Sequence, residues 1–220
     1  MKSLRAFVLL IVSEVRYISP MTSKNEKPNV PGYKLLKLIG EGGMGAVYFG
    51  RRESDSLPVA IKFARVGKDG LNHFSSRLKR ELDVSKTFAH PYVVKILDSG
   101  FIDSGDMYIA MEFIEGVSLF EACDRMMSIA DAQRLLEHLA EALSYIHSLG
   151  VIHRDIKPSN IVVESTGRTV LLDFGLVKAP DLTAMTKTEE LVGTFSYMAP
   201  ETLKRKNVTA AADIYSLGST

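Results

Sequence analysis

Two short segments contain a set of side chains that can handle phosphate groups. Residues 153–160 read His-Arg-Asp-Ile-Lys-Pro-Ser-Asn, and Asp-Phe-Gly follows at 173–175. The segments supply the carboxylates Asp155 and Asp173, the ammonium group Lys157 and the amide Asn160. Carboxylate and amide oxygens suit Mg²⁺, and a further carboxylate can orient a hydroxyl group. His-Arg-Asp alone could occur by chance as a polar turn, but the whole set at these spacings could not. The set predicts a site that holds Mg²⁺ and a nucleotide phosphate beside an acceptor hydroxyl.

These segments need rigid elements to position them. Ser128-Ile129-Ala130-Asp131 resembles a capping box, and the apolar residues that follow recur at spacings of three and four residues up to Gly150. This pattern predicts a helix that leads into the segment 151–160. A short hairpin is expected between Asn160 and Asp173. The apolar residues of the predicted helix are Leu135, Leu139, Ala142, Leu143 and Ile146.

The first half of the chain contains a glycine-rich loop. Gly40, Gly42 and Gly45 follow a predicted strand that begins at Tyr33, and Val47 lies in the next predicted strand. The spacing alone is weak evidence, because dinucleotide-binding folds use a similar loop. A Rossmann loop would continue into a helix, and a Walker loop would continue with Lys-Ser/Thr. The second strand therefore favours a hairpin whose backbone N–H groups approach a triphosphate.

Lys62 ends the apolar run Val59-Ala60-Ile61-Lys62. It could be an edge lysine that points to water, or it could bind the α- and β-phosphates and pair with a helix carboxylate. The segment 71–88 has the periodicity of a helix, and Glu81 is its only glutamate. Glu81 is therefore the predicted partner of Lys62.

Residues 33–220 resemble the eukaryotic-type (Hanks-type) serine/threonine protein kinases, and especially bacterial members. The resemblance rests on the glycine loop, Lys62, the two segments described first, and Ala199-Pro200-Glu201. It implies an α+β fold with two lobes: a five-stranded antiparallel N-lobe with one helix, and a mainly helical C-lobe. The implied boundaries are an N-terminal extension and linker at 1–32, an N-lobe at 33–111, a hinge at 112–116 and a partial C-lobe at 117–220.

The resemblance also implies a site for ATP. Met111 would be the gatekeeper, and backbone groups of Glu112 and Ile114 would meet adenine. Taken singly, the apolar members of this set are ordinary core residues, and only the aligned set supports a purine pocket. The residues implied to enclose the ring are Ile39, Val47, Ala60 and Val162.

The remaining roles follow from phosphoryl transfer, in which a protein mainly positions groups and neutralises charge. Asp155 would orient the acceptor hydroxyl, Lys157 would contact the γ-phosphate, and Asn160 with Asp173 would hold two Mg²⁺ ions. The lysine at position 157 favours serine and threonine over tyrosine as the acceptor residues of the protein substrate. By resemblance, Thr194 bridges Asp155 and Lys157, and Thr186 and Thr188 are candidate autophosphorylation sites whose phosphate would pair with Arg154; either could equally be an ordinary loop threonine.

Composition narrows the class of protein. The 27 Lys and Arg residues nearly balance the 26 Asp and Glu residues, which argues against nucleic-acid binding. One cysteine, Cys123, suits a reducing compartment, so a cytoplasmic location is expected. Residues 6–12 are apolar but too few to span a bilayer and lack a cleavage site, and translation could instead start at Met21.

Three alternatives follow from the same motifs. A pseudokinase scaffold would bind ATP without transfer, but every catalytic position that can be checked is filled. Small-molecule kinases lack the peptide-docking segment and Ala-Pro-Glu. Residues 212–218 resemble the start of the central helix of the large lobe, where Asp213 would hold the backbone of the catalytic loop, and the given sequence ends at Thr220. The sequence is then either a fragment or a C-terminally truncated product, and the isolated 220-residue chain is expected to be aggregation-prone and weakly active. A homodimer through the small lobes is implied by resemblance only.

Overall fold

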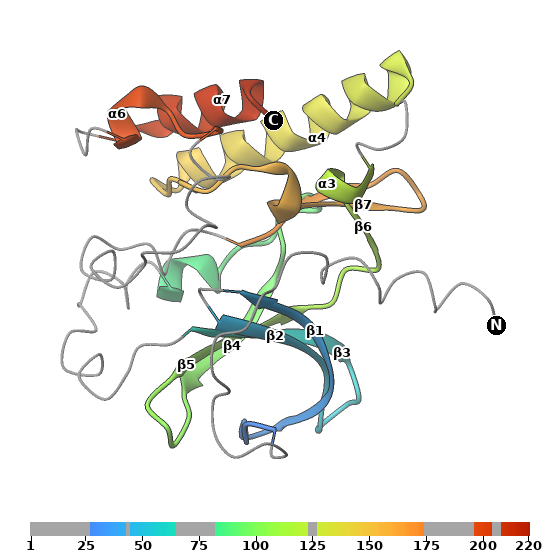
Figure 1. Cartoon of the computed structure of the whole chain (residues 1–220), viewed down its shortest axis with the longest axis vertical. Coiled ribbons are helices and arrows are strands. Elements are labelled where there is room, and N and C mark those ends of the chain that lie inside the picture. Colours follow the sequence, from blue (N-terminus) through green and yellow to red (C-terminus); the bar gives the residue numbers. More distant parts are fainter. Residues whose placement is uncertain (1–26, 43–44, 65–81, 123–126, 174–195, 204–207) are drawn as a thin grey trace. The chain divides into compact units, whose positions relative to one another are not determined.

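The computed structural model describes residues 27–42, 45–64, 82–122, 127–173, 196–203 and 208–220 (Figure 1). The chain forms two compact units. Unit 1 consists of Met1–Phe74 and Ile96–Phe113, and unit 2 consists of Ser75–Lys95 and Ile114–Thr220. Among the described residues, no helix combines the length and the apolar character needed to cross a membrane.

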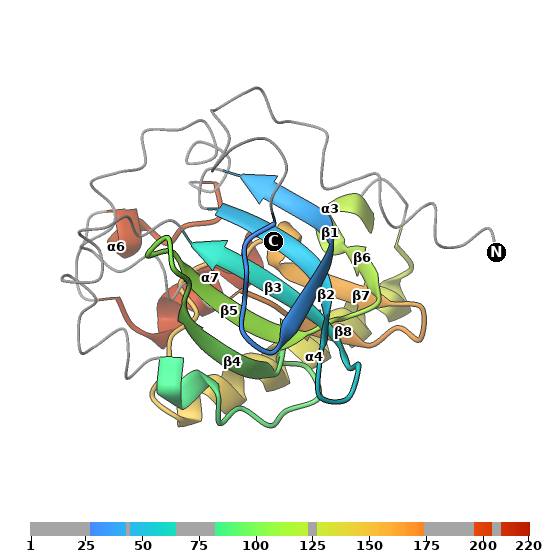
Figure 2. The same cartoon turned by 90° about the horizontal axis from the view of Figure 1, so that it is seen from below.

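Unit 1 is built on an antiparallel sheet of five strands, as predicted. The strands run in the spatial order β1-β2-β3-β5-β4, and each pairs with its neighbours in antiparallel register. Figure 2 shows the strands side by side and strongly twisted. Of the helix predicted at 71–88, the described residues 82–85 are helical and belong to unit 2, and those up to 81 lie outside the described part. The strands are β1 (Tyr33–Gly42), β2 (Gly45–Arg52), β3 (Pro58–Ala64), β4 (Ile96–Phe101) and β5 (Met107–Glu112).

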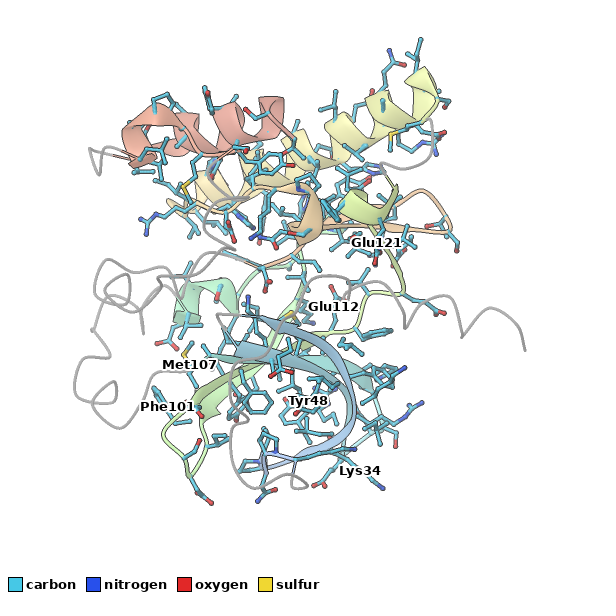
Figure 3. All side chains as sticks on the ribbon, in the orientation of Figure 1. Lys34, Tyr48, Phe101, Met107, Glu112 and Glu121 are labelled. Atoms are coloured by element: carbon cyan, nitrogen blue, oxygen red, sulfur yellow. The ribbon has the colours of Figure 1, made fainter. Side chains whose placement is uncertain are left out.

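One face of this sheet carries the core of unit 1. Val59, Ile61 and Phe63 alternate along β3 and are at most 1% exposed. They pack with Tyr108 and Ala110 of β5 in one buried cluster. Since side chains alternate between the faces of a strand, Ala60 and Lys62 lie on the opposite face. Figure 3 labels the partly buried Tyr48 on β2 and the buried Met107 on β5.

The segment before β1 belongs to the same unit. Val30 is 2% exposed and lies in the core cluster, and the N–H of Tyr33 donates to its carbonyl at 3.1 Å. Gly32, with a φ of 79°, forms the turn between them. The ammonium group of Lys27 donates to the carbonyls of Leu35 and Leu36 at 3.3 and 2.7 Å. These contacts attach residues 27–32 to the edge of the sheet.

Unit 2 contains a small sheet and most of the helices. Strands β6 (Gly116–Ser118), β7 (Ile161–Glu164) and β8 (Thr169–Leu171) form an antiparallel sheet in that order. The long helix α4 (Ile129–Ser148) begins as predicted, because the side chain of Ser128 accepts a hydrogen bond from the Asp131 N–H. Shorter helical segments complete the unit: α3 (Leu119–Ala122), η1 (Pro158–Asn160), α6 (Pro200–Leu203) and α7 (Ala210–Gly218).

Helix α4 supplies much of the core of unit 2. The five apolar residues predicted for its inner face are all buried: Leu135, Leu139, Ala142, Leu143 and Ile146. Gly150 follows the helix with a φ of 74°, a conformation that glycine adopts without strain. The expected α+β architecture, with a five-stranded antiparallel sheet in one half and mainly helical structure in the other, is confirmed.

Candidate active site

The segment 153–160 brings three predicted catalytic side chains together. The amide nitrogen of Asn160 donates to the carbonyl oxygen of Asp155 at 2.8 Å and to its Oδ2 at 2.9 Å. Lys157 Nζ lies 3.4 Å from the same Oδ2. Asp155 is 9% exposed, so its carboxylate is held in place and largely screened from water. The cluster therefore presents an ordered carboxylate beside an ammonium group.

The same contacts set the direction of the Asn160 amide. Both hydrogen bonds use its nitrogen, so its oxygen faces the other side of the planar group. An amide oxygen and a carboxylate are hard oxygen donors of the kind Mg²⁺ prefers. Among the described residues, no group of three or more His, Cys, Asp or Glu side chains could hold a metal ion by itself. The Asn160 amide oxygen and the Asp173 carboxylate are both of the ligand type that Mg²⁺ prefers.

His153 ties this loop to the strand that precedes Asp173. Its Nε2 donates to the carbonyl of Leu172 at 2.7 Å, and its Nδ1 accepts from the N–H of Asp155 at 3.3 Å. The ring is fully buried, and desolvation lowers its pKa despite the opposing effect of nearby carboxylates, Asp213 first among them. The imidazole is thus neutral at physiological pH, which allows one ring nitrogen to donate while the other accepts.

The carboxylate of Asp213 binds the backbone at the start of the segment 153–160. Its Oδ2 accepts from the N–H of His153 and its Oδ1 from the N–H of Arg154, both at 2.8 Å. The carboxylate is 1% exposed, and these donors offset the cost of burying it. Sequence reasoning anticipated this support but missed His147, whose Nε2 lies 2.8 Å from Asp213 Oδ2. The only signal for His147 was its place in the last turn of the predicted helix.

Asp173 follows β8 after Leu172. Its φ of 50° is in the left-handed region, which non-glycine residues rarely adopt. Arg154 has a similar φ of 64°. Such backbone conformations persist only where surrounding contacts impose them. The Arg154 N–H donates to Asp213, and Leu172, which precedes Asp173, hydrogen-bonds to Asn160 and His153.

Unit 1 gathers a second set of predicted residues on one face of its sheet. In the antiparallel register Val47 pairs with Lys62, and Ala60 pairs with Met111. Directly paired residues project to the same side of a sheet, so these four side chains share the face opposite the core of unit 1. An ammonium group at one end of an apolar patch is a suitable surface for a purine and its phosphates.

Gly45 allows the backbone of β2 to approach β3 closely. A Cβ at this position would lie 1.8 Å from the carbonyl oxygen of Phe63, and its φ is 140°. No other residue type fits without moving one strand. The other loop glycines that the structure describes, Gly40 and Gly42, lie at the end of β1.

The remaining predicted adenine contacts are distributed over both units. Ile39 lies in β1 and Glu112 ends β5, where Figure 3 labels it. Ile114 is buried in unit 2, and Val162 is half-buried in β7. Four predicted residues lie outside the described part of the chain: Glu81, Thr186, Thr188 and Thr194.

Comparison with known proteins identifies the family. The family model described as protein kinase domain matches residues 33–220. The chain therefore belongs to the protein kinase domain family, and the resemblance inferred from its motifs is confirmed.

Its relatives include bacterial proteins named as serine/threonine-protein kinases. Lactococcus lactis PknB, named as a probable kinase of this type, is 36% identical over 190 residues, which cover 84% of this chain and 30% of that protein. Mycobacterium tuberculosis PknD is 37% identical over 187 residues, with 84% and 28% covered. Bacillus subtilis PrkC is 34% identical over 188 residues, with 84% and 29% covered. The chain thus spans less than a third of the length of these relatives.

Solved structures agree with this assignment. A crystal structure of the Mycobacterium tuberculosis PknI kinase domain matches with a TM-score of 0.68 and 28% identity, covering 85% of this chain and 69% of that one. Another structure of the same kinase domain matches with a TM-score of 0.67 and 27% identity, covering 89% and 74%.

Proposed function

We propose that this chain transfers the γ-phosphoryl group of ATP to serine and threonine hydroxyls of proteins. The observation that carries the proposal is the geometry at Asp155, whose Oδ2 is held by Asn160 at 2.9 Å and approached by Lys157 at 3.4 Å. The serine/threonine-protein kinase names of the relatives support the same reaction.

In this proposal each group of the loop has one task. Asp155 orients the acceptor hydroxyl and accepts its proton, while Lys157 neutralises charge on the phosphoryl group in transit. Asn160 and Asp173 would hold Mg²⁺, which when bound would neutralise negative charge on the phosphates. Asp213 and His153 keep the loop backbone in register, since their hydrogen bonds link it to α7 and to Leu172.

The nucleotide-binding role belongs to the face of unit 1 described above. Lys62 would bind the α- and β-phosphates and pair with Glu81, and the backbone of β1 and β2 around Gly40, Gly42 and Gly45 would approach the phosphates. The adenine would contact Met111, the backbone of Glu112 and Ile114, and the side chains of Ile39, Val47, Ala60 and Val162. The register that places Val47, Ala60, Lys62 and Met111 on one face supports this part of the proposal.

Regulation is proposed to use the segment between Asp173 and Ala199. Thr194 would bridge Asp155 and Lys157 when a peptide docks. Phosphate on Thr186 or Thr188 would pair with Arg154, whose backbone is fixed by Asp213. A cytoplasmic location and a homodimer through the small lobes are further parts of the proposal.

One experiment separates the kinase from an ATP-binding scaffold. The purified chain is incubated with γ-labelled ATP, Mg²⁺ and a generic protein rich in Ser and Thr, and the labelled amino acids are identified. Phosphoserine and phosphothreonine that require Mg²⁺ and disappear in Asp173→Ala support the proposal. Nucleotide binding detected by a thermal shift, without any labelled protein, would favour the scaffold.

A further inference from the structure

The edge of β8 that faces away from β7 forms hydrogen bonds that have no role in the proposed mechanism. The Leu171 N–H donates across it to the carbonyl of Tyr92 at 2.9 Å, and the Leu171 carbonyl accepts from Val94 at 3.0 Å. Because alternate N–H groups of a strand point to the same edge, the Thr169 N–H points outward as well. It donates to Nδ1 of His138 at 3.3 Å.

Tyr92 and His138 support each other. Their rings stack with centroids 3.9 Å apart and planes inclined by 25°. Tyr92 thus contributes its carbonyl to Leu171 and its ring to the imidazole that binds Thr169. The Tyr92 N–H in turn donates to Nδ1 of His90 at 3.3 Å, and His90 stacks on Tyr145 of α4 with centroids 4.9 Å apart. One residue therefore joins β8 to helix α4 through both its backbone and its ring.

The strand that these contacts hold leads directly to Asp173. From the other side Leu172 donates to the carbonyl of Asn160 at 2.8 Å and accepts from His153 at 2.7 Å. Asp173 itself has a left-handed φ of 50°, so its carboxylate position depends on where β8 ends. Thr169 is 1% exposed and Leu171 is fully buried, so water cannot replace a lost partner at this edge without a structural opening.

We propose that His138 and Tyr92 are positioning residues that fix β8 and thereby aim the carboxylate of Asp173 at bound Mg²⁺. The inference rests on the proposed function, because it assumes that Asp173 is a metal ligand. The pair acts through the strand and does not touch the substrate. Residues that orient a metal ligand without binding the metal commonly change metal affinity by about 10- to 100-fold when they are replaced.

The test compares His138→Leu and Tyr92→Leu, which remove the acceptor and the stacked ring respectively, with two conservative variants. His138→Asn retains an acceptor near the position of Nδ1, and Tyr92→Phe retains the ring; the backbone carbonyl of residue 92 is present in every variant. Glu137→Gln, at an exposed position next to His138 on α4, is the matched control. Two quantities are measured on the full chain: amide hydrogen exchange at Thr169, and the affinity for Mn²⁺ in the presence of a non-hydrolysable ATP analogue.

We expect His138→Leu and Tyr92→Leu to accelerate exchange at Thr169 and to weaken Mn²⁺ binding about tenfold. His138→Asn and Tyr92→Phe should remain within about threefold of the unmutated protein, and Glu137→Gln should be unchanged. If the Leu variants lose folded protein, His138→Asn still tests the inference: weaker Mn²⁺ binding with unchanged exchange at Thr169 in this variant would contradict it.

Two results overturn the inference in different ways. Faster exchange at Thr169 with unchanged Mn²⁺ affinity would make the pair purely structural, and the proposed function would stand. No nucleotide-dependent Mn²⁺ binding by the unmutated protein would remove the proposed function itself, together with this extension of it.

Discussion

At the scale of residues, the buried carboxylate of Asp213 organises the segment that carries Asp155. It accepts hydrogen bonds from two consecutive backbone N–H groups and lies 2.8 Å from His147 Nε2. The sequence motifs predicted Asp155, Lys157 and Asn160 as neighbours because their offsets are fixed along one loop. They did not predict His147, since its partner is 66 residues away and no periodicity reports such a contact.

Replacing His147 should destabilise the loop without removing any proposed catalytic group. His147→Leu leaves the buried Asp213 charge with one donor fewer, which costs about 1–3 kcal/mol of folding free energy. His147→Gln retains an N–H near the position of Nε2 and should recover most of that loss. Urea denaturation of the two variants measures the difference. Equal stability of both variants would show that the contact with Asp213 contributes nothing.

Burial of His153 predicts a loss of stability in mild acid. Desolvation lowers its pKa in the folded protein below the ordinary value of 6.5. The unfolded state therefore binds a proton first as the pH falls, so this stabilisation is complete above about pH 6.5 and is lost as the pH falls toward the folded pKa. The free energy of unfolding should be lower at pH 5.5 than at pH 7.5.

His90 requires a control in the same experiment, because desolvation lowers its pKa too. The His90→Gln variant should keep most of the pH dependence if His153 is its main source. A variant whose stability no longer changes between these pH values would assign the effect to His90 instead.

At the scale of elements, local sequence patterns predict the strands and the long helix, whereas tertiary contacts determine where these elements begin and end. The run Val93–Phe101 reads as one strand, whereas β4 begins at Ile96 and Val93 instead bridges Leu171 of β8. The run is apolar both where it bridges β8 and where it forms β4, so its composition does not show where β4 begins. The position of β8, which distant residues determine, separates the two parts.

Gly45 offers a direct test of the close approach between β2 and β3. Gly45→Ala would place a Cβ 1.8 Å from the Phe63 carbonyl, at a φ of 140° that a side chain disfavours. We expect a loss of about 1–3 kcal/mol in folding free energy and weaker ATP binding. Gly218→Ala, where no atom lies within 4 Å of the added Cβ, is the matched control. Comparable thermal melts for the two variants would contradict the tight strand contact.

At the scale of the whole molecule, the core of unit 1 includes a residue that lies before the first kinase motif. The polar composition and the prolines of residues 22–32 predict a linker, and they give no sign that Val30 is 2% exposed in the core of unit 1. A single apolar residue in a polar segment has no periodicity to report its burial. The kinase resemblance, by contrast, predicted the five-stranded sheet, and the capping residues with the apolar periodicity predicted helix α4.

Val30→Ser should therefore destabilise unit 1. Burial of a valine side chain contributes about 1.5–3 kcal/mol, and the serine hydroxyl would add a desolvation cost. Asn29→Ala, at the exposed neighbouring position, should have little effect. Chemical denaturation followed by a probe in the five-stranded sheet measures both. A change at Asn29 as large as that at Val30 would indicate a general effect of the segment and not the core contact.

Phosphoryl transfer by this chain is proposed to depend on Asp155. The direct measurement is the single-turnover rate of γ-phosphate transfer to a protein substrate for the unmutated chain, Asp155→Asn and the exposed control Asp83→Asn. Loss of a general base predicts a fall of about 10²- to 10⁴-fold for Asp155→Asn with nucleotide affinity retained, and no change for Asp83→Asn. Equal transfer rates for the unmutated chain and Asp155→Asn would contradict the account.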